Sequence, residues 1–193
     1  FGEGAASDDL PYTDVGRADW FHDPVAYAYE HGIMSGVSED RFEPEGTLTR
    51  AMMVAMLWRL EGQPQPESVR SFADVPDGTW YTQAVEWAAE KGIVSGYGDD
   101  LFGPEDNITR EQLAAILYRY AAEKAYDTSQ GGMAAREFSD WGSVSPYAEQ
   151  AISWAVNAGI ISGMGDNTLA PRGTATRGQA AVILMGLDKL AGL

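Results

Sequence analysis

Three Thr-Arg pairs are the residues of this sequence best suited to bind a ligand: Thr49-Arg50, Thr109-Arg110 and Thr176-Arg177. The spacing of the apolar residues that follow predicts a helix beginning at each threonine. Each arginine then lies at the positive end of a helix dipole, where a cation is unfavourable by up to about 1 kcal/mol. Because this arrangement occurs three times, we expect a negatively polarised partner to offset the cost.

Two kinds of partner would serve. The first is a carboxylate of the chain itself in an ion pair, either Asp106 or the aspartate that opens a neighbouring repeat. The second is an external anion, because free N–H groups at a helix N-terminus and a guanidinium fork together suit a carboxylate or phosphate. The spacing leaves both alternatives open.

The threonines have a structural explanation of their own. A threonine hydroxyl at a helix start can accept a backbone N–H. Gln112 and Gln179 stand three residues after Thr109 and Thr176 and would complete a capping box in each helix. Met52 occupies that place in the first of the three helices and cannot do so.

Other polar groups are weaker candidates. Asp99-Asp100 and Asp106-Asn107 lack the spacing of an EF-hand and are typical of turns. His22 and His31 have no cysteine partners, so we expect no metal and no cofactor. No two carboxylates stand out as an acid and base pair, so we expect no catalytic residues and no enzyme activity.

Aromatic and basic residues also recur. Trp20 and Trp80 begin helices, with Tyr147 in the corresponding third place. Beside a polar groove such rings could stack on sugars, although tryptophan at helical spacing more often lies in a core. Arg59 and Arg119 stand near helix C-termini, where positive charge is favoured, and we expect them to be structural.

These residues recur because the chain repeats one sequence three times. Gly32 and Gly92 are 60 positions apart, and Gly92 and Gly159 are 67 apart. Each repeat opens with an aspartate, which we call the lead-in aspartate: Asp14, Asp74 and Asp140. We expect a lead-in at 1–11, repeats at 12–60, 72–120 and 138–193 (the last with a tail), and linkers at 61–71 and 121–137.

Each repeat predicts two helices joined by a loop, which makes the fold all-α. The first helix of the second repeat has one apolar face: Tyr81, Ala84, Val85 and Ala88. Its second helix has another: Leu113, Ile116, Leu117 and Tyr120. Phe102 is an apolar plug in the loop between them, and Gly92 ends the first helix. A loop glycine recurs in all three repeats: Gly36, Gly96 and Gly163.

Composition restricts the partners. The 193 residues carry a net charge of -16, which disfavours nucleic acid and anionic lipid. The longest apolar run, Ala180 to Met185, is too short to insert into a membrane. Each repeat is near the size at which an isolated core is marginal, so we expect the three to pack together. The chain starts at Phe1 rather than Met, and we expect it to be a piece of a longer protein.

Each repeat resembles the S-layer homology (SLH) repeat. The resemblance rests on the lead-in FADV, the helix-ending Gly-Ile, the loop Phe-x-Pro and the Thr-Arg pair, in that order. It covers about 12–187, and the third copy departs most because Leu169-Ala170-Pro171 replaces Phe-x-Pro. The resemblance implies three repeats packed as a pseudo-threefold trimer with grooves between neighbours.

The same resemblance implies a function. SLH domains anchor S-layer proteins and surface enzymes non-covalently to the wall of Gram-positive-type bacteria, outside the cell. Their usual ligand is a secondary cell wall polysaccharide, often ending in pyruvylated N-acetylmannosamine. The family motif Thr-Arg-Ala-Glu lies at the grooves, and its arginine helps to bind the anionic sugar.

Applied to this chain, the resemblance implies that the polysaccharide is bound by these residues: Arg50, Arg110, Arg177, Gln112, Gln179, Gly36, Gly96, Gly163, Trp20 and Trp80. The motif's final glutamate is absent from every copy. Glutamine is a mild replacement because it can still form a capping box. Met52 is a larger one, and it makes the groove that uses Arg50 the least favoured of the three.

Two other functions would fit a different reading of the arginines. A protein–protein self-assembly module of a surface layer would use them to bridge carboxylates, with other copies of the surface protein as partners. A hydrolytic enzyme would need one unrepeated acid or nucleophile set, and the sequence offers none that stands out.

Overall fold

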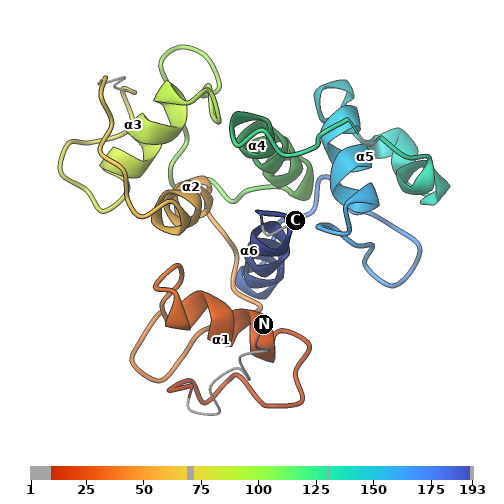
Figure 1. The fold of residues 1–193 in the computed structure, drawn as a ribbon, viewed down its shortest axis with the longest axis horizontal. Coiled ribbons are helices and arrows are strands. Elements are labelled where there is room, and N and C mark those ends of the chain that lie inside the picture. Colours follow the sequence, from red (N-terminus) through yellow and green to blue (C-terminus); the bar gives the residue numbers. More distant parts are fainter. Residues whose placement is uncertain (1–9, 69–71, 130, 192–193) are drawn as a thin grey trace. The chain divides into compact units, whose positions relative to one another are not determined.

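The computed structural model describes residues 10–68, 72–129 and 131–191 (Figure 1). Six α-helices and no β-strands are found among these residues, which confirms the predicted all-α class. The α-helices are α1 (His22–Glu30), α2 (Arg50–Leu60), α3 (Thr82–Glu90), α4 (Arg110–Glu123), α5 (Glu149–Asn157) and α6 (Arg177–Ala191). Short 3-10 helices are η1 (Ala134–Glu137), η2 (Trp141–Ser143) and η3 (Pro146–Ala148).

The chain divides into two compact units. The terminal unit joins the two ends of the chain, Phe1–Thr47 and Thr176–Leu193. The central unit is Leu48–Ala175. Each unit therefore contains pieces of more than one repeat.

In the terminal unit, α1 packs against α6 (Figure 1). The apolar face of α1 is buried at Val25 and Ala28, together with the N-cap residue Phe21. The facing side of α6 buries Ile183 and Leu187. The first helix of the first repeat is thus covered by the second helix of the third repeat.

The central unit follows the same rule twice: α2 packs against α3, and α4 packs against α5 (Figure 1). In each pair, the second helix of one repeat covers the first helix of the next. The predicted faces of α3 and α4 are buried, including Val85 and Leu117 with no exposed surface. Each of these packed helix pairs therefore combines helices from two neighbouring repeats.

Three equivalent residues of the central unit form a closed ring of backbone hydrogen bonds. The N–H of Leu48 donates to Ala175 (N···O 3.1 Å), that of Ala175 to Ile108 (3.0 Å) and that of Ile108 to Leu48 (2.8 Å). Each residue stands directly before a threonine of a Thr-Arg pair, and each is fully buried. The ring satisfies backbone groups that would otherwise be costly to bury.

The helix starts are capped as the sequence predicts. Thr109 and Gln112 exchange both bonds of a capping box, with N···O distances of 3.2 and 3.1 Å. Thr176 and Gln179 do the same, at 3.2 Å in both directions. Thr49 caps α2 with its hydroxyl alone.

The last apolar residue of the second helix is buried to different degrees in the first and second repeats. Leu60, which corresponds to the predicted core residue Tyr120, is half-buried because α2 ends there, with Gly62 directly after its cap. Its counterpart Tyr120 is 2% exposed because α4 continues to Glu123 and covers it. No helix in the described ranges combines the length and the apolar character needed to cross a membrane.

Candidate ligand-binding site

The three arginines of the Thr-Arg pairs are buried at the first positions of α2, α4 and α6. They are 5 to 7% exposed. Each points its guanidinium at the loop of the repeat that its helix covers, and each Nε donates to a loop carbonyl. The bonds are Arg50 to Phe102 (2.9 Å), Arg110 to Leu169 (2.7 Å) and Arg177 to Phe42 (2.8 Å).

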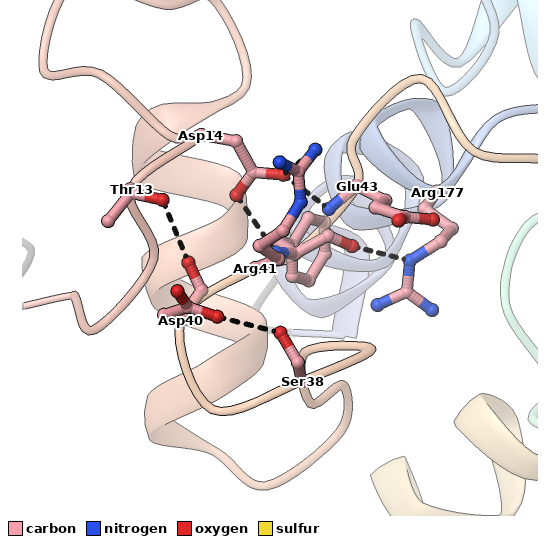
Figure 2. A network of polar contacts seen from close by, with 8 residues as sticks. Thr13, Asp14, Ser38, Asp40, Arg41, Glu43 and Arg177 are labelled. Atoms are coloured by element: carbon pink, nitrogen blue, oxygen red, sulfur yellow. Dashed lines mark hydrogen bonds and ion pairs between the residues drawn. The ribbon is translucent and has the colours of Figure 1, made fainter.

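The lead-in aspartates hold these loops from the other side. Asp14 accepts the backbone N–H of Phe42 at 2.9 Å and that of Glu43 at 2.8 Å (Figure 2). Burial raises the pKa of Asp14, but the two N–H groups and nearby Arg41 outweigh it, so the pKa is lowered overall. Asp74 and Asp140 bind the equivalent loop N–H groups in the same way.

A direct ion pair for these arginines was one of the two expectations, and the structure contradicts it. Across the described residues, no carboxylate lies within 4.0 Å of Arg50, Arg110 or Arg177. Asp106 and Asp140 are near Arg50 and Arg110 and act on them only through charge. Burial lowers the pKa of all three arginines, and the cost is met by carbonyl dipoles rather than by a carboxylate.

The terminal nitrogens distinguish Arg50 from the other two. One Nη of Arg110 donates to the carbonyl oxygen of Ser162, and one Nη of Arg177 to that of Ser35, both at 2.6 Å. Neither Nη of Arg50 has an acceptor among the described residues; its guanidinium carbon instead lies 4.3 Å from the centre of the Tyr97 ring. Since no fully buried side-chain nitrogen or oxygen in the described part lacks a partner, these Nη groups reach open space.

That space is a pocket of about 340 Å³ in the central unit, which we call the Arg50 pocket. Its walls come from the start of α2, the second-repeat loop, one side of α4 and the start of the third repeat's first helix. The lining residues are Arg50, Val94, Ser95, Gly96, Tyr97, Gln112, Ala115, Ile116, Arg119 and Tyr147.

The polar side chains of the Arg50 pocket are oriented by their neighbours. The Gln112 side-chain oxygen accepts the Thr109 N–H in the capping box. Burial raises the pKa of Tyr97, while the charge of Arg50 and the amide of Gln112 lower it. Burial, and then the charge and hydrogen bonding of Glu111, raise the pKa of Tyr147 to about 12. Glu111 itself is buried and accepts from the N–H and the hydroxyl of Ser145 at 2.9 and 2.8 Å. The pocket thus presents guanidinium, amide and phenol groups beside aromatic rings.

Three of the predicted site residues meet in this pocket: Arg50, Gly96 and Gln112. The arginine comes from the first repeat and the glutamine from the second, because α2 covers the second repeat's loop. Met52, the departure that made the Arg50 groove the least favoured, is not among the lining residues. The motif positions that meet in the pocket therefore belong to neighbouring repeats.

Three lining residues were missed as binding candidates: Tyr97, Arg119 and Tyr147. Arg119 already had a structural explanation as a cation near a helix C-terminus. The sequence signal for Tyr97 is that a large apolar or aromatic residue follows the loop glycine in every repeat. The three residues are Val37, Tyr97 and Met164, and each is about half exposed. Tyr147 is 56% exposed, which a helix-start aromatic in a core would not be.

The loop glycines make room for the aromatic ring that opens each repeat. A Cβ at Gly96 would lie 2.8 Å from a ring carbon of Phe72. A Cβ added at Gly36 or Gly163 would likewise overlap a ring carbon of Tyr12 or Phe138. Only Gly96 of the three also lines the Arg50 pocket.

The tryptophans fall into two groups. Trp20 and Trp80 are 59% and 53% exposed and lie edge-on to the next residue in the chain. Neither lines the Arg50 pocket, where the equivalent Tyr147 stands. Trp87 and Trp154 are buried, as expected of tryptophan at helical spacing, whereas the expectation is wrong for Trp20 and Trp80. In the described part of the chain, no group of three or more His, Asp or Glu residues is placed to hold a metal.

Comparison with known proteins decides the family. The S-layer homology domain matches the sequence three times, at residues 11–52, 71–114 and 137–181. The chain belongs to the S-layer homology domain family. This confirms the predicted family, and with it a place at the bacterial cell surface, outside the cell.

The SLH chain is similar to one part of several large proteins. It is 35% identical to an amylopullulanase of Thermoanaerobacterium thermosulfurigenes, over 95% of this chain and 10% of that protein. It is 30% identical to the S-layer protein sap of Bacillus anthracis, over 94% and 22%. It is 26% identical to a cellulosome-anchoring protein of Acetivibrio thermocellus, over 91% and 38%. The chain therefore spans well under half the length of these relatives.

Proposed function

We propose that this SLH chain is a non-covalent anchoring module that binds an anionic secondary cell wall polysaccharide, with the Arg50 pocket as a binding site. The observation that carries the proposal is the open guanidinium fork of Arg50. It is a buried cation with no ion-pair partner in the described structure, facing a pocket large enough for a sugar.

The contacts of the Arg50 pocket suit a carboxylate on a sugar. The two Nη groups can bind both oxygens of one carboxylate, and burial strengthens that interaction relative to water. Tyr97 and Tyr147 can pack against the apolar face of a sugar ring. The terminal carboxylate of pyruvylated N-acetylmannosamine has this chemistry, and we propose it as the ligand.

The other two arginines are proposed as further sites. Arg110 and Arg177 give one Nη to a loop carbonyl, which leaves one Nη for a ligand. A single charge-assisted bond is weaker than a bidentate pair, so these sites should bind less tightly than the Arg50 pocket. Gln179, Gly36, Gly163, Trp20 and Trp80 remain proposed ligand contacts on the basis of the family resemblance alone.

The net charge predicts how binding should depend on salt. A chain of charge -16 repels an anionic polymer at long range, while contacts within the pocket act at short range. Moderate salt screens the repulsion more than the buried contacts, so wall binding should persist at about 0.15 M salt. We propose no catalysis for this module; in enzymes such as the amylopullulanase it matches only a small part.

The test is co-sedimentation of the chain with purified Gram-positive sacculi, before and after chemical removal of the secondary polymer. We expect binding to intact sacculi only, and about tenfold weaker binding for Arg50→Gln, since a charge-assisted pair contributes about 1.5 kcal/mol or more. Arg59→Gln is the matched control, because Arg59 lies on the same helix but outside the pocket.

Other outcomes would overturn the proposal. Equal binding to stripped peptidoglycan would mean that another wall component is recognised. If the chain bound neither preparation but assembled with itself as concentration rose, the self-assembly alternative would be favoured. An unfolding curve for Arg50→Gln separates lost binding from lost folding, because Arg50 also holds the loop carbonyl of Phe102.

A further inference from the structure

We propose that Arg119 is a second anion-binding side chain of the Arg50 pocket, and that this pocket selects a glycan carrying two neighbouring acidic groups. This inference rests on the proposed function and deepens it, because it names the charge pattern of the ligand. It concerns a residue outside the Thr-Arg motif.

Arg119 and Arg50 lie at different depths of one pocket. Arg119 is exposed and projects from α4, two helical turns after Gln112 and one turn after Ile116, so the three form a stripe along one wall. Arg50 is 6% exposed and fixed by its bond to the Phe102 carbonyl. One cation is therefore fixed inside the pocket, and the other is exposed to solvent at its edge.

The chain does not neutralise this pair of cations. Across the described residues no carboxylate lies within 4.0 Å of Arg119 or Arg50, in a protein with 29 acidic residues. Asp106 acts on Arg50 only through its charge, and Glu111, in the first turn of α4, is used by Ser145 and Tyr147. Burial lowers the pKa of Arg50, and the positive charge of Arg119 lowers it further by a smaller amount, as expected for like charges in one pocket.

The equivalent positions in the other repeats differ. Gly186 replaces Arg119 in the third repeat and carries no charge. Arg59 replaces it in the first repeat; burial lowers its pKa, and it is half-buried rather than exposed. An exposed cation in the same pocket as an open guanidinium fork is thus a property of this pocket and not of the repeat.

This arrangement fits a ligand with two acidic groups on adjoining sugars. The first carboxylate would bind the fork of Arg50, and the next acidic group along the glycan would meet Arg119 at the mouth. That second group can be a carboxylate or a phosphate, because a guanidinium binds both.

The test is calorimetric titration of the full chain with three synthetic glycosides. The first is the methyl glycoside of 4,6-pyruvylated N-acetylmannosamine, with one negative charge. The second joins that sugar to glucuronic acid and has two charges. The third is the same disaccharide with the uronic acid as its methyl ester, which restores a single charge at equal size.

We expect the wild type to bind the doubly charged disaccharide about three- to fivefold more tightly than its ester, the range of an exposed ion pair. Arg119→Gln should abolish this preference, so that the doubly charged disaccharide and its ester bind within about twofold of each other. Arg59→Gln should keep the preference. A phosphorylated analogue of the disaccharide then shows which acidic group is preferred.

Two results would overturn the inference without touching the proposed function. One is a wild type that binds the methyl glycoside but does not distinguish the disaccharide from its ester. The other is an Arg119→Gln variant that keeps the wild-type preference. A wild type that binds no glycoside and no sacculi would instead refute the proposed function itself.

Discussion

Asp74 and Arg50 bind opposite ends of one residue. The carboxylate of Asp74 accepts the backbone N–H of Phe102 at 2.8 Å, and Nε of Arg50 donates to the Phe102 carbonyl at 2.9 Å. The Phe102 ring is fully buried. The loop is thus fixed by an acid from its own repeat and a base from the repeat before it, with no direct contact between the two charges.

The same connection occurs at the other two arginines. Asp140 and Arg110 bind the N–H and the carbonyl of Leu169 at 2.8 and 2.7 Å. Asp14 and Arg177 do so at Phe42, as Figure 2 shows. The lead-in aspartate is therefore a positioning residue. It holds the loop residue whose carbonyl oxygen accepts the hydrogen bond from the arginine Nε, and so it orients the guanidinium.

Asp74→Asn tests this connection. Asparagine keeps one acceptor but turns an N–H₂ group toward the N–H of Phe102 or Gly103, so one of the two bonds is lost. We expect a loss of about 1–3 kcal/mol in the free energy of unfolding in urea, and weaker sedimentation with sacculi.

Asp99→Asn is the control for that substitution, because Asp99 is exposed in the same loop and has no side-chain hydrogen bond in the described structure. It should change the free energy of unfolding by no more than about 0.5 kcal/mol. Equal effects of the two substitutions would show that Asp74 does not hold the loop.

Much of the fold could be predicted because its signals are local. The apolar faces follow from three- and four-residue steps, and the capping boxes of α4 and α6 follow from a threonine and a glutamine three residues apart. The glycine that ends each first helix has a positive φ, at 66°, 71° and 70° for Gly32, Gly92 and Gly159. Each of these features is determined within a few residues.

The site was harder to predict because it is built between repeats. The sequence showed Arg50 beside Met52, whereas the fold brings Arg50 to Gln112. It suggested carboxylates as partners of the arginines, because backbone carbonyls leave no trace in a sequence. Arg119 was assigned to a helix C-terminus, and only the folded chain places it in a pocket with Arg50.

Stability in acid should depend on Asp14. Burial raises its pKa, the N–H bonds from Phe42 and Glu43 lower it, and the net pKa lies below its usual value near 4. Its contribution is therefore fully present above the unfolded-state pKa and is lost as the pH falls through the lower folded-state pKa.

The measurement is urea unfolding of the wild type and Asp14→Asn at several pH values. The stability difference between them should be largest near pH 7 and should shrink below about pH 4. A difference that stays constant down to about pH 2 would mean that the Asp14 carboxylate does not stabilise the loop through its charge.

Met52→Gln should add the missing capping box to α2. Thr49 already accepts the N–H of Met52 at 3.2 Å, but no side chain in the described part of the chain returns a bond to the Thr49 N–H. A glutamine there should raise the free energy of unfolding by about 0.5–1 kcal/mol. Met52→Leu, which has no acceptor, is the control, and an equal gain from leucine would assign the effect to packing.

Gly96 should tolerate no side chain, for two separable reasons. Its φ is +74°, and an added Cβ would lie 2.5 Å from the Leu101 carbonyl oxygen and 2.8 Å from the Phe72 ring. Gly98 has a φ of +97° but open space around it, and Gly142 has open space and no positive φ. Comparing alanine at these three positions therefore separates backbone strain from steric overlap.

We expect Gly142→Ala to change the free energy of unfolding by less than about 0.5 kcal/mol. Gly98→Ala should cost about 1–2 kcal/mol from backbone strain, and Gly96→Ala about 2–4 kcal/mol because overlap is added. Since Gly96 also lines the Arg50 pocket, the Gly96 variant should lose sedimentation with sacculi under conditions where it is still folded. If it matched Gly98→Ala in both assays, the close approach of the loop to the Phe72 ring would not matter for stability or binding.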